Sequence, residues 1–388
     1  MLLELTEPHR GPAGQNVYRQ TLGIVRPMGS DSGVWSFIRR PDIGDGNMHL
    51  TRVILATLAV LTTGGLVQAA EETLTLHHFL SPKSMTHQQL IVPWAERVAQ
   101  QSDGRIAIEV FPSMSMGGKA PELYRQLRDG SADIVWTLIG YTPGVFPRSE
   151  VFELPTVHRG SSLATTLAIQ DMLDVVSADY PDIKLLLLHV HAGNALHMVD
   201  KPVNSVADLK GLKLRTPSRT GAWLIEALDA EPVGMPVPAL PQALSKGVVD
   251  GALVPFEIVP PLKLQELTDY SIEAANGDRF GTSVFLFAMN MERYQSLPED
   301  LRAVIDANSG SNIAAEMGEI WMQGEQPGMK MQRASGGDII ALDAETMSEF
   351  NNRGELVVQR WVAQMREQGI DGLGLVEQAR AAVEKHSN

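Results

Sequence analysis

Short apolar strands alternate with amphipathic helices along most of this chain, and this order restricts the fold more than any other feature. The first group predicts strands over 73–76, 105–111 and 132–136, with helices over 86–101 and 121–127 between them. In the strand at 105–111, Ile106, Ile108 and Val110 share one face, as expected for a half-buried strand. Strands that alternate with helices in this way predict an open, mostly parallel α/β sheet.

A second series of strands and helices follows the same alternating order further along the chain. It predicts strands over 183–190, 212–216, 233–235 and 248–254, with helices over 205–208, 220–229 and 238–245. A strand over 280–290 would then return to the first group. Helical pattern follows over 296–331, with Gly310, Gly318, Gly324 and Pro327 as weak points, and again over 344–366 and 373–386. We expect two lobes bridged by a long helix: residues 71–193 with 280–319 form lobe I, and 194–279 with 320–388 form lobe II.

Residues 48–70 have the features of a secretory signal peptide. Arg52 follows Met48, the stretch from Val53 to Val67 is uncharged, and small residues precede Glu71. A membrane span needs about 20 apolar residues, and three Thr and two Gly dilute this stretch. We therefore expect a mature chain that begins near Ala70 or Glu71, lies in the periplasm and does not insert into the membrane. We interpret residues 1–47 as an over-extended start or a disordered extension.

Composition excludes several classes of function. The chain has 32 Lys and Arg residues against 46 Asp and Glu residues, a net charge of −14, which argues against a nucleic-acid partner. It has no cysteine, so disulfides, Cys-ligated zinc, iron–sulfur clusters and thiol catalysis are excluded.

Sequence motifs for cofactor binding and catalysis are also missing. There is no G-x-G-x-x-G, P-loop, H-E-x-x-H or G-x-S-x-G pattern. The histidines at 77–78 and 189–191 lack a carboxylate at ligand spacing, and adjacent strand residues point to opposite faces. We expect no metal, no cofactor and no catalytic residues.

Three predicted strands end in residues that suit a binding site. In open α/β sheets, ligands bind beyond the carboxyl ends of the strands. One strand ends in Trp136, one in Arg215 and one in Val254. An arginine there can bind a carboxylate through two parallel hydrogen bonds, although a solvated charge at the sheet edge is the alternative.

Five segments carry a resemblance to a known family. They are His78-Phe-Leu80, Gly104-Arg-Ile-Ala-Ile-Glu-Val-Phe-Pro112, Leu127-Arg-Asp-Gly-Ser-Ala-Asp-Ile134, Asp208-Leu-Lys-Gly-Leu-Lys-Leu-Arg-Thr-Pro217 and Ala243-Leu-Ser-Lys-Gly-Val-Val-Asp-Gly251. Their order and spacing resemble those of the DctP-type substrate-binding proteins of TRAP (tripartite ATP-independent periplasmic) transporters, over essentially all of 71–388. The resemblance implies a two-lobed periplasmic-binding-protein fold that closes on a small organic acid. It also implies delivery of that acid to a TRAP membrane permease, and it assigns the carboxylate-binding role to Arg215.

Two positions depart from the pattern of family members that bind sugar acids. Those members carry a second Arg near the position of Ala195 and an Asn near that of Val254. Both exchanges remove polar groups, so we expect an apolar or aromatic monocarboxylate, with a C4-dicarboxylate or a sugar acid as the alternative. The candidate binding residues are Arg215, Trp136, Tyr141, Thr137, Pro217, Val254, Phe256, Glu257, Phe280 and Asn194. For each aromatic residue, packing in the core is the competing interpretation.

A second hypothesis is an exported enzyme that acts on a small acid. Glu257 is the candidate carboxylate for a general base near the strand ends. A purely structural protein conflicts with the two-lobed pattern and with an arginine at a strand end.

Overall fold

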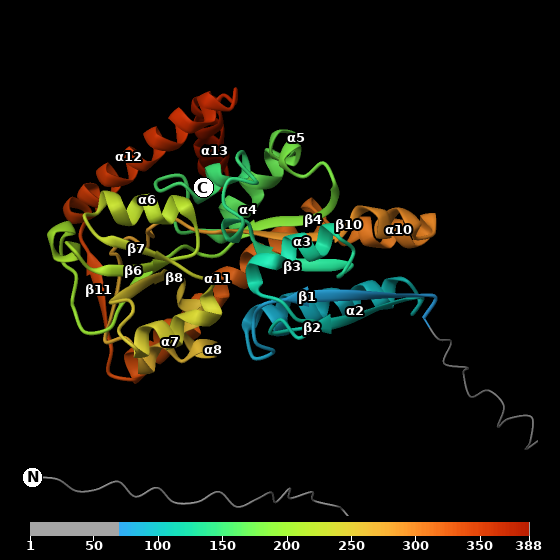
Figure 1. Cartoon of the computed structure of the whole chain (residues 1–388), viewed down its shortest axis with the longest axis horizontal. Helices are drawn as coiled ribbons and strands as arrows, with labels where there is room; N and C mark the ends of the chain where they lie inside the picture. The colour runs from blue at the N-terminus through green and yellow to red at the C-terminus, as the bar shows by residue number, and fades with distance from the viewer. Residues whose placement is uncertain (1–69, 388) are drawn as a thin grey trace, which may run out of the picture. The chain divides into compact units, whose positions relative to one another are not determined.

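A computed structural model describes residues 70–387, so the predicted extension and almost all of the predicted signal peptide lie outside the described residues. The strands form two sheets, ordered β2-β1-β3-β10-β4 and β11-β9-β5-β8-β6-β7 (Figure 1). The first contains β1 (Glu72–His78), β2 (Ile106–Phe111), β3 (Ile134–Leu138), β4 (Ile183–Val190) and β10 (Val284–Asn290). The second contains β5 (Ala195–Met198), β6 (Lys213–Thr216), β7 (Glu231–Gly234), β8 (Gly251–Val254), β9 (Tyr270–Ala274) and β11 (Asp338–Leu342).

In each sheet, one strand runs against the others. β10 pairs antiparallel with β3 and β4, and β5 pairs antiparallel with β8 and β9. The pairs β1–β2, β1–β3, β6–β7, β6–β8 and β9–β11 are parallel. The reversed strands are those that the chain enters directly after it crosses from one sheet to the other. The prediction of a two-lobed α/β fold with mostly parallel sheets is therefore confirmed.

Helices cover both sheets. They are α2 (Val92–Gln101, preceded by a π-helical turn Thr86–Ile91), α3 (Leu123–Arg128), α4 (Ser162–Asp171), α5 (Leu173–Val176), α6 (Arg219–Ala227), α7 (Leu240–Ser245), α8 (Val259–Leu262), α9 (Met291–Ser296), α10 (Glu299–Ala307), α11 (Ser311–Ala334), α12 (Ala344–Glu367) and α13 (Gly372–His386). Short 3-10 helices span Ala120–Glu122, Ile139–Tyr141, Ser149–Glu153, Ser177–Asp179, Val206–Leu209, Val237–Ala239, Phe256–Ile258 and Leu264–Glu266. None of the helices in the described part of the chain is both long and apolar enough to cross a membrane.

The long helix begins later than the sequence predicts. The prediction of a continuous helix over 296–331 is wrong, because Gly310 adopts a φ of 56° and separates α10 from α11. α11 packs on α4 and β4 beside the first sheet, and on α8 and β11 beside the second, so it does bridge both parts. Gly328 permits this packing, because a side chain there would overlap the backbone carbonyl of Phe256.

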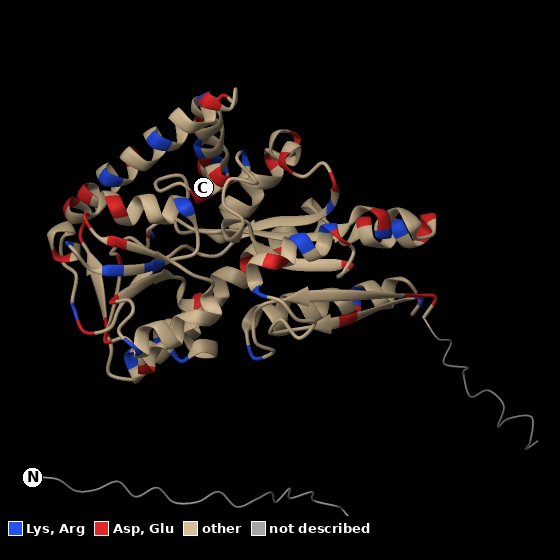
Figure 2. Cartoon of the chain, in the orientation of Figure 1, with Lys and Arg blue, Asp and Glu red and all other residues tan. Residues whose placement is uncertain are grey.

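The C-terminal helices divide between the two sheets. α12 packs on α6, beside the second sheet, whereas α13 packs on α4, beside the first. The predicted boundary places α13 in lobe II, so its position differs from that assignment, and the other lobe limits remain our proposal. Charged residues of both signs alternate along outer helices such as α10 and α12 (Figure 2).

Candidate ligand pocket

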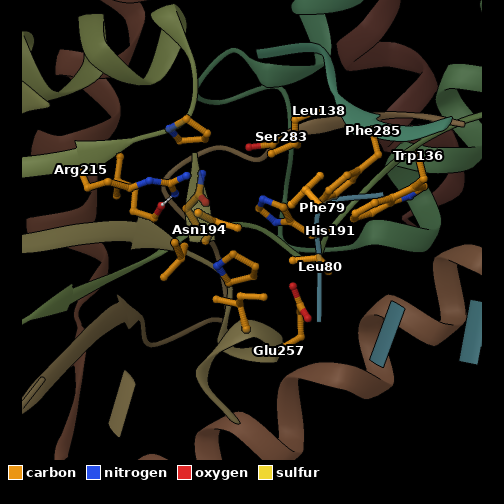
Figure 3. Close-up of a pocket in the computed structure, with 16 residues that line it drawn as sticks. Phe79, Leu80, Trp136, Leu138, His191, Asn194, Arg215, Glu257, Ser283 and Phe285 are labelled. Atoms are coloured by element: carbon orange, nitrogen blue, oxygen red, sulfur yellow. Dashed lines mark hydrogen bonds between the residues drawn. The ribbon is translucent and has the colours of Figure 1, made fainter. Parts of the chain in front are cut away.

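A small pocket lies between the two sheets. The first sheet contributes Trp136 and Leu138 from β3 and Phe285 from β10, and the second contributes Arg215, Leu253 and Val254. The segments that cross between the sheets contribute His191, Asn194 and Ser283. Phe79, Leu80, Pro217, Val237, Pro255, Glu257 and Ile258 complete the lining (Figure 3).

Arg215 is the cation of this pocket, and only 2% of its surface is exposed. Its Nε donates to the carbonyl of Met235 at 3.0 Å, and its Nη1 donates to the carbonyl of Leu253 at 3.3 Å. Nη2 is buried without a hydrogen-bond partner in residues 70–387. Burial lowers the pKa of Arg215, and the nearby Tyr141 hydroxyl acts in the opposite direction. A guanidinium held in this way leaves both N–H groups of Nη2 for an anion.

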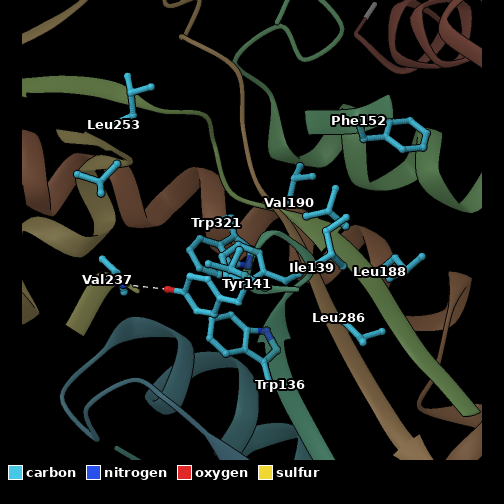
Figure 4. Close-up of a cluster of buried hydrophobic side chains, with 14 of the residues drawn as sticks. Trp136, Ile139, Tyr141, Phe152, Leu188, Val190, Val237, Leu253, Leu286 and Trp321 are labelled. Carbon is cyan, nitrogen blue, oxygen red and sulfur yellow. Dashed lines mark hydrogen bonds between the residues drawn. The ribbon is translucent and has the colours of Figure 1, made fainter. Parts of the chain in front are cut away.

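An aromatic stack forms the wall of the pocket on the side of the first sheet. The ring of Trp136 lies 4.6 Å from that of Phe285 and 5.1 Å from that of Phe79, both in stacked geometry. The indole Nε1 of Trp136 donates to His189 Nε2 at 3.0 Å, so its polar atom is satisfied inside the core. The ring of Trp321 of α11 stacks on that of Phe285 at 5.0 Å between centroids. Figure 4 shows Trp321 close to Trp136, with centroids 6.4 Å apart. This side of the pocket is therefore apolar, and Trp136 is fully buried within the stack.

Four polar side chains line the pocket in addition to Arg215, namely His191, Asn194, Ser283 and Glu257. The backbone N–H of Gly193 donates to His191 Nδ1 at 3.0 Å, and burial lowers the pKa of His191 well below its usual value. His191 is therefore neutral, with its proton on Nε2. Asn194 Oδ1 is buried without a partner among the described residues. Burial, and then the charge of Glu325, raise the pKa of Glu257 well above its usual value.

Six of the ten residues predicted for the site line this pocket: Arg215, Trp136, Pro217, Val254, Glu257 and Asn194. Thr137 does not line it, because neighbouring residues of β3 point to opposite faces. Phe256 packs on His197, with ring centroids 4.9 Å apart, and Phe280 packs on Phe350, 5.2 Å away. The Tyr141 hydroxyl accepts from the backbone N–H of Val237 at 2.9 Å, beside the pocket rather than in its lining (Figure 4). The assignment of the ten predicted residues to a ligand site remains a proposal.

The sequence reasoning missed His191, Ser283 and the aromatic residues Phe79 and Phe285. His191 directly follows β4, so the strand-end rule that selected Arg215 could have selected it as well. Instead, the prediction weighed the neighbouring histidines only as metal ligands. No group of three or more potential metal-ligating side chains occurs within residues 70–387.

Comparison with known proteins decides the family. Residues 76–377 match the DctP family, described as bacterial extracellular solute-binding protein, family 7. The chain belongs to this family. The prediction of a DctP-type substrate-binding protein of a TRAP transporter is confirmed by this match and by the similar TRAP solute-binding proteins of known structure.

Solved structures and a curated relative resemble this DctP-family chain along most of its length. A TRAP solute-binding protein from a marine metagenome, specific for aromatic acid ligands and crystallised with 3-hydroxybenzoate, is 40% identical with a TM-score of 0.80; the match covers 82% of this chain and 100% of that one. A TRAP solute-binding protein from Rhodoferax ferrireducens T118, solved with copurified benzoate, is 41% identical with a TM-score of 0.79, over 81% of this chain and 98% of that one. The outer membrane transporter protein TsaT of Comamonas testosteroni is 24% identical over 329 residues, which are 81% of this chain and 92% of that protein.

Proposed function

We propose that this protein binds an aromatic monocarboxylate between its two sheets. The carboxylate pairs with Arg215, and the ring lies against Trp136 and Phe285. The observation that carries the proposal is the free Nη2 of a buried arginine in a pocket with an aromatic wall. The ligands of the two relatives at 40% and 41% identity, 3-hydroxybenzoate and benzoate, support it.

The free-energy contributions of hydrogen bonding and apolar burial favour a ligand with one carboxylate and a flat apolar body. A hydrogen bond to a charged group contributes about 1.5–3 kcal/mol, and burial of apolar surface contributes roughly 25 cal/mol per Å². Among the lining residues, Arg215 is the one with a permanent positive charge. A second carboxylate in this pocket would lack a cation, and an unpaired buried charge costs several kcal/mol. A C4-dicarboxylate therefore fits this pocket poorly.

The two lobes close on the ligand and then deliver it to a TRAP membrane permease. Closure is favoured because the ligand contacts both sheets at once, Arg215 on β6 and Trp136 on β3. This transport role places the protein in the periplasm, which agrees with the signal-like segment 48–70 and with the family's extracellular description.

The intact mass of protein recovered from the periplasm should correspond to a start near Ala70 or Glu71. A mass that includes residues 1–47 would contradict this assignment.

The protein acts as a receptor rather than an enzyme. The carboxyl group of Glu257, the candidate general base, is held neutral by burial, and a neutral carboxyl group cannot accept a proton. Incubation of the purified protein with benzoate should return the acid unchanged. Conversion of the acid would support the enzyme hypothesis.

Identification of the small molecules that copurify with the protein tests the ligand class. After native purification and solvent extraction, we expect mass spectrometry to detect an aromatic monocarboxylate in near-stoichiometric amount. The Arg215→Ala variant, prepared in parallel, should yield none. Recovery of succinate, malate or a sugar acid from the wild-type protein would refute the proposed ligand class and leave the family assignment intact.

A further inference from the structure

Glu257 is the acidic side chain among the residues that line the pocket. It lies in the short helix Phe256–Ile258, which follows β8, and only 5% of its surface is exposed. Its Oε2 is buried without a hydrogen-bond partner in the described part of the chain. Figure 3 shows its carboxyl group directed into the pocket from a different side than Arg215. A buried polar atom in this state needs a partner, and the pocket is where one can come from.

The surroundings of Glu257 contain charges, but these pair with one another. Glu325 of α11 accepts a hydrogen bond from the backbone N–H of Glu257 at 3.2 Å. Arg279 Nη2 lies 3.5 Å from Glu325 Oε2, and its Nη1 lies 2.7 Å from Glu273 Oε2. Two other carboxylates therefore already share this cation. Glu257 forms no ion pair with another residue among residues 70–387. Its carboxyl group is therefore neutral, with one O–H donor and one carbonyl acceptor.

We propose that Glu257 determines specificity by hydrogen-bonding a hydroxyl substituent on the ring of the bound aromatic acid, at a point away from Arg215. This inference rests on the proposed function and names the substituent that the pocket selects. A hydroxyl group suits a neutral carboxyl group because each can donate and accept. A second carboxylate does not suit it, because the new charge would lie beside Glu257 and near Glu325 without a cation to pair with.

An unsubstituted ring would leave Glu257 without a partner, so the wild-type protein should prefer a hydroxylated ligand. A net gain of one neutral hydrogen bond corresponds to a roughly 3- to 10-fold lower Kd. The same preference disfavours isophthalate, which carries a carboxylate where 3-hydroxybenzoate carries its hydroxyl group.

Calorimetric titration of four acids into the wild-type protein and three variants tests this inference. The acids are benzoate, 3-hydroxybenzoate, 4-hydroxybenzoate and isophthalate, and the readout is the ratio of the Kd for benzoate to that for each hydroxybenzoate. We expect at least one ratio of about 3–10 in the wild-type protein. Glu257→Gln should keep this ratio, because an amide also donates and accepts. Glu257→Leu should reduce it to about 1 while the affinity for benzoate stays within roughly threefold.

Glu325→Gln is the matched control, because it changes the neighbouring buried carboxyl group, which does not line the pocket. It should leave the ratio unchanged. If Glu257→Leu does not fold, as judged by its melting curve, Glu257→Met replaces it.

Two results overturn the inference while the proposed function stands. One is a wild-type protein that binds benzoate at least as tightly as both hydroxybenzoates. The other is an unchanged ratio in Glu257→Leu, which would move the hydroxyl partner to Asn194, His191 or Ser283. If the wild-type protein binds none of the aromatic acids, the proposed function fails, and this inference fails with it.

Discussion

Arg215 is held in position before any ligand arrives. The carbonyl groups of Met235 and Leu253 fix its Nε and Nη1, and Nη2 alone has no partner in the described chain. Such preorganisation reduces the entropic cost of ordering the side chain when an anion binds. It also makes the planar guanidinium group hard to replace, because an ammonium group cannot make the same set of contacts.

Replacement of Arg215 should abolish tight binding without unfolding the protein. For Arg215→Ala and Arg215→Lys, we expect Kd values for benzoate at least about 100-fold higher, since two charge-assisted hydrogen bonds contribute about 3–6 kcal/mol. Calorimetry measures the affinity, and circular dichroism checks the fold. Lys213→Ala, at the exposed first residue of the same strand, is the control and should bind normally. Affinity close to wild type in either Arg215 variant would place the anion site elsewhere.

His197 should make the stability of the protein depend on pH. Burial, above all, lowers its pKa to about 3, and its Nδ1 lies 2.9 Å from Ser271 Oγ. Between pH of about 6.5 and 3, the unfolded state binds a proton that the folded state does not, so the free energy of unfolding falls as the pH falls. His197→Gln should flatten this slope by up to about 1.4 kcal/mol per pH unit, measured by urea denaturation from pH 7 to pH 4. An identical slope in both proteins would show that protonation of His197 does not destabilise the folded state.

Residue patterns revealed the polar part of the site better than the apolar part. Arg215 could be predicted because it lies at a strand end and in a segment that resembles the DctP family. Phe285 could not, because an apolar residue in a strand has the same pattern whether it faces the core or a pocket. Thr137 faces away from the pocket because side-chain direction alternates along β3. Phe256 lies in the 3-10 helix after β8 and Phe280 precedes β10, and both rings pack on other rings instead.

At the scale of elements, strand and helix alternation predicted the sheets but not every strand. β5, β9 and β11 were missed, because each lies outside the regular alternation of strands and helices. The break at Gly310 is a backbone effect, since a φ of 56° cannot continue a helix. The helical pattern on either side of Gly310 gave no sign of how far the chain turns there.

Close packing of α11 on the Phe256–Ile258 helix should be sensitive to a single methyl group. In an ordinary helix, Gly→Ala stabilises by up to about 1 kcal/mol, but at Gly328 the new Cβ would overlap the carbonyl of Phe256. We expect Gly328→Ala to destabilise the protein by roughly 1–3 kcal/mol, measured by urea denaturation. Gly234→Ala is the matched control, because no atom lies within 4 Å of its added Cβ. Equal stability of the two variants would show that α11 moves away from Phe256 without a loss of stability.

At the scale of the whole molecule, contacts between the two lobes favour a closed arrangement. Arg219 of α6 pairs with Glu150 of the 3-10 helix Ser149–Glu153, with its Nε 2.8 Å from Oε1. Tyr141, which follows β3, accepts a hydrogen bond from Val237, which follows β7. Both contacts join segments that follow different sheets, so ligand affinity includes the free energy of bringing these segments together.

Loss of the Tyr141 hydroxyl should therefore weaken binding although this residue does not line the pocket. We expect Tyr141→Phe to raise the Kd for benzoate by roughly 2- to 10-fold, because one neutral hydrogen bond of the closed state is lost. Tyr180→Phe is the control, because the Tyr180 hydroxyl donates to Ser149 without crossing between the sheets. If the Tyr141 variant binds as tightly as the wild-type protein, this contact does not contribute to closure.

The most direct test of the central claim is a set of calorimetric titrations of the wild-type protein with benzoate, 3-hydroxybenzoate, succinate, malate and sialic acid. The protein should bind at least one of the two aromatic acids with a micromolar or lower Kd, equivalent to about −8 kcal/mol. Succinate, malate and sialic acid should bind at least about 100-fold more weakly, because Arg215 can pair with one carboxylate and the aromatic wall cannot hydrogen-bond hydroxyl groups. Tightest binding of succinate, malate or sialic acid would contradict this account of the pocket.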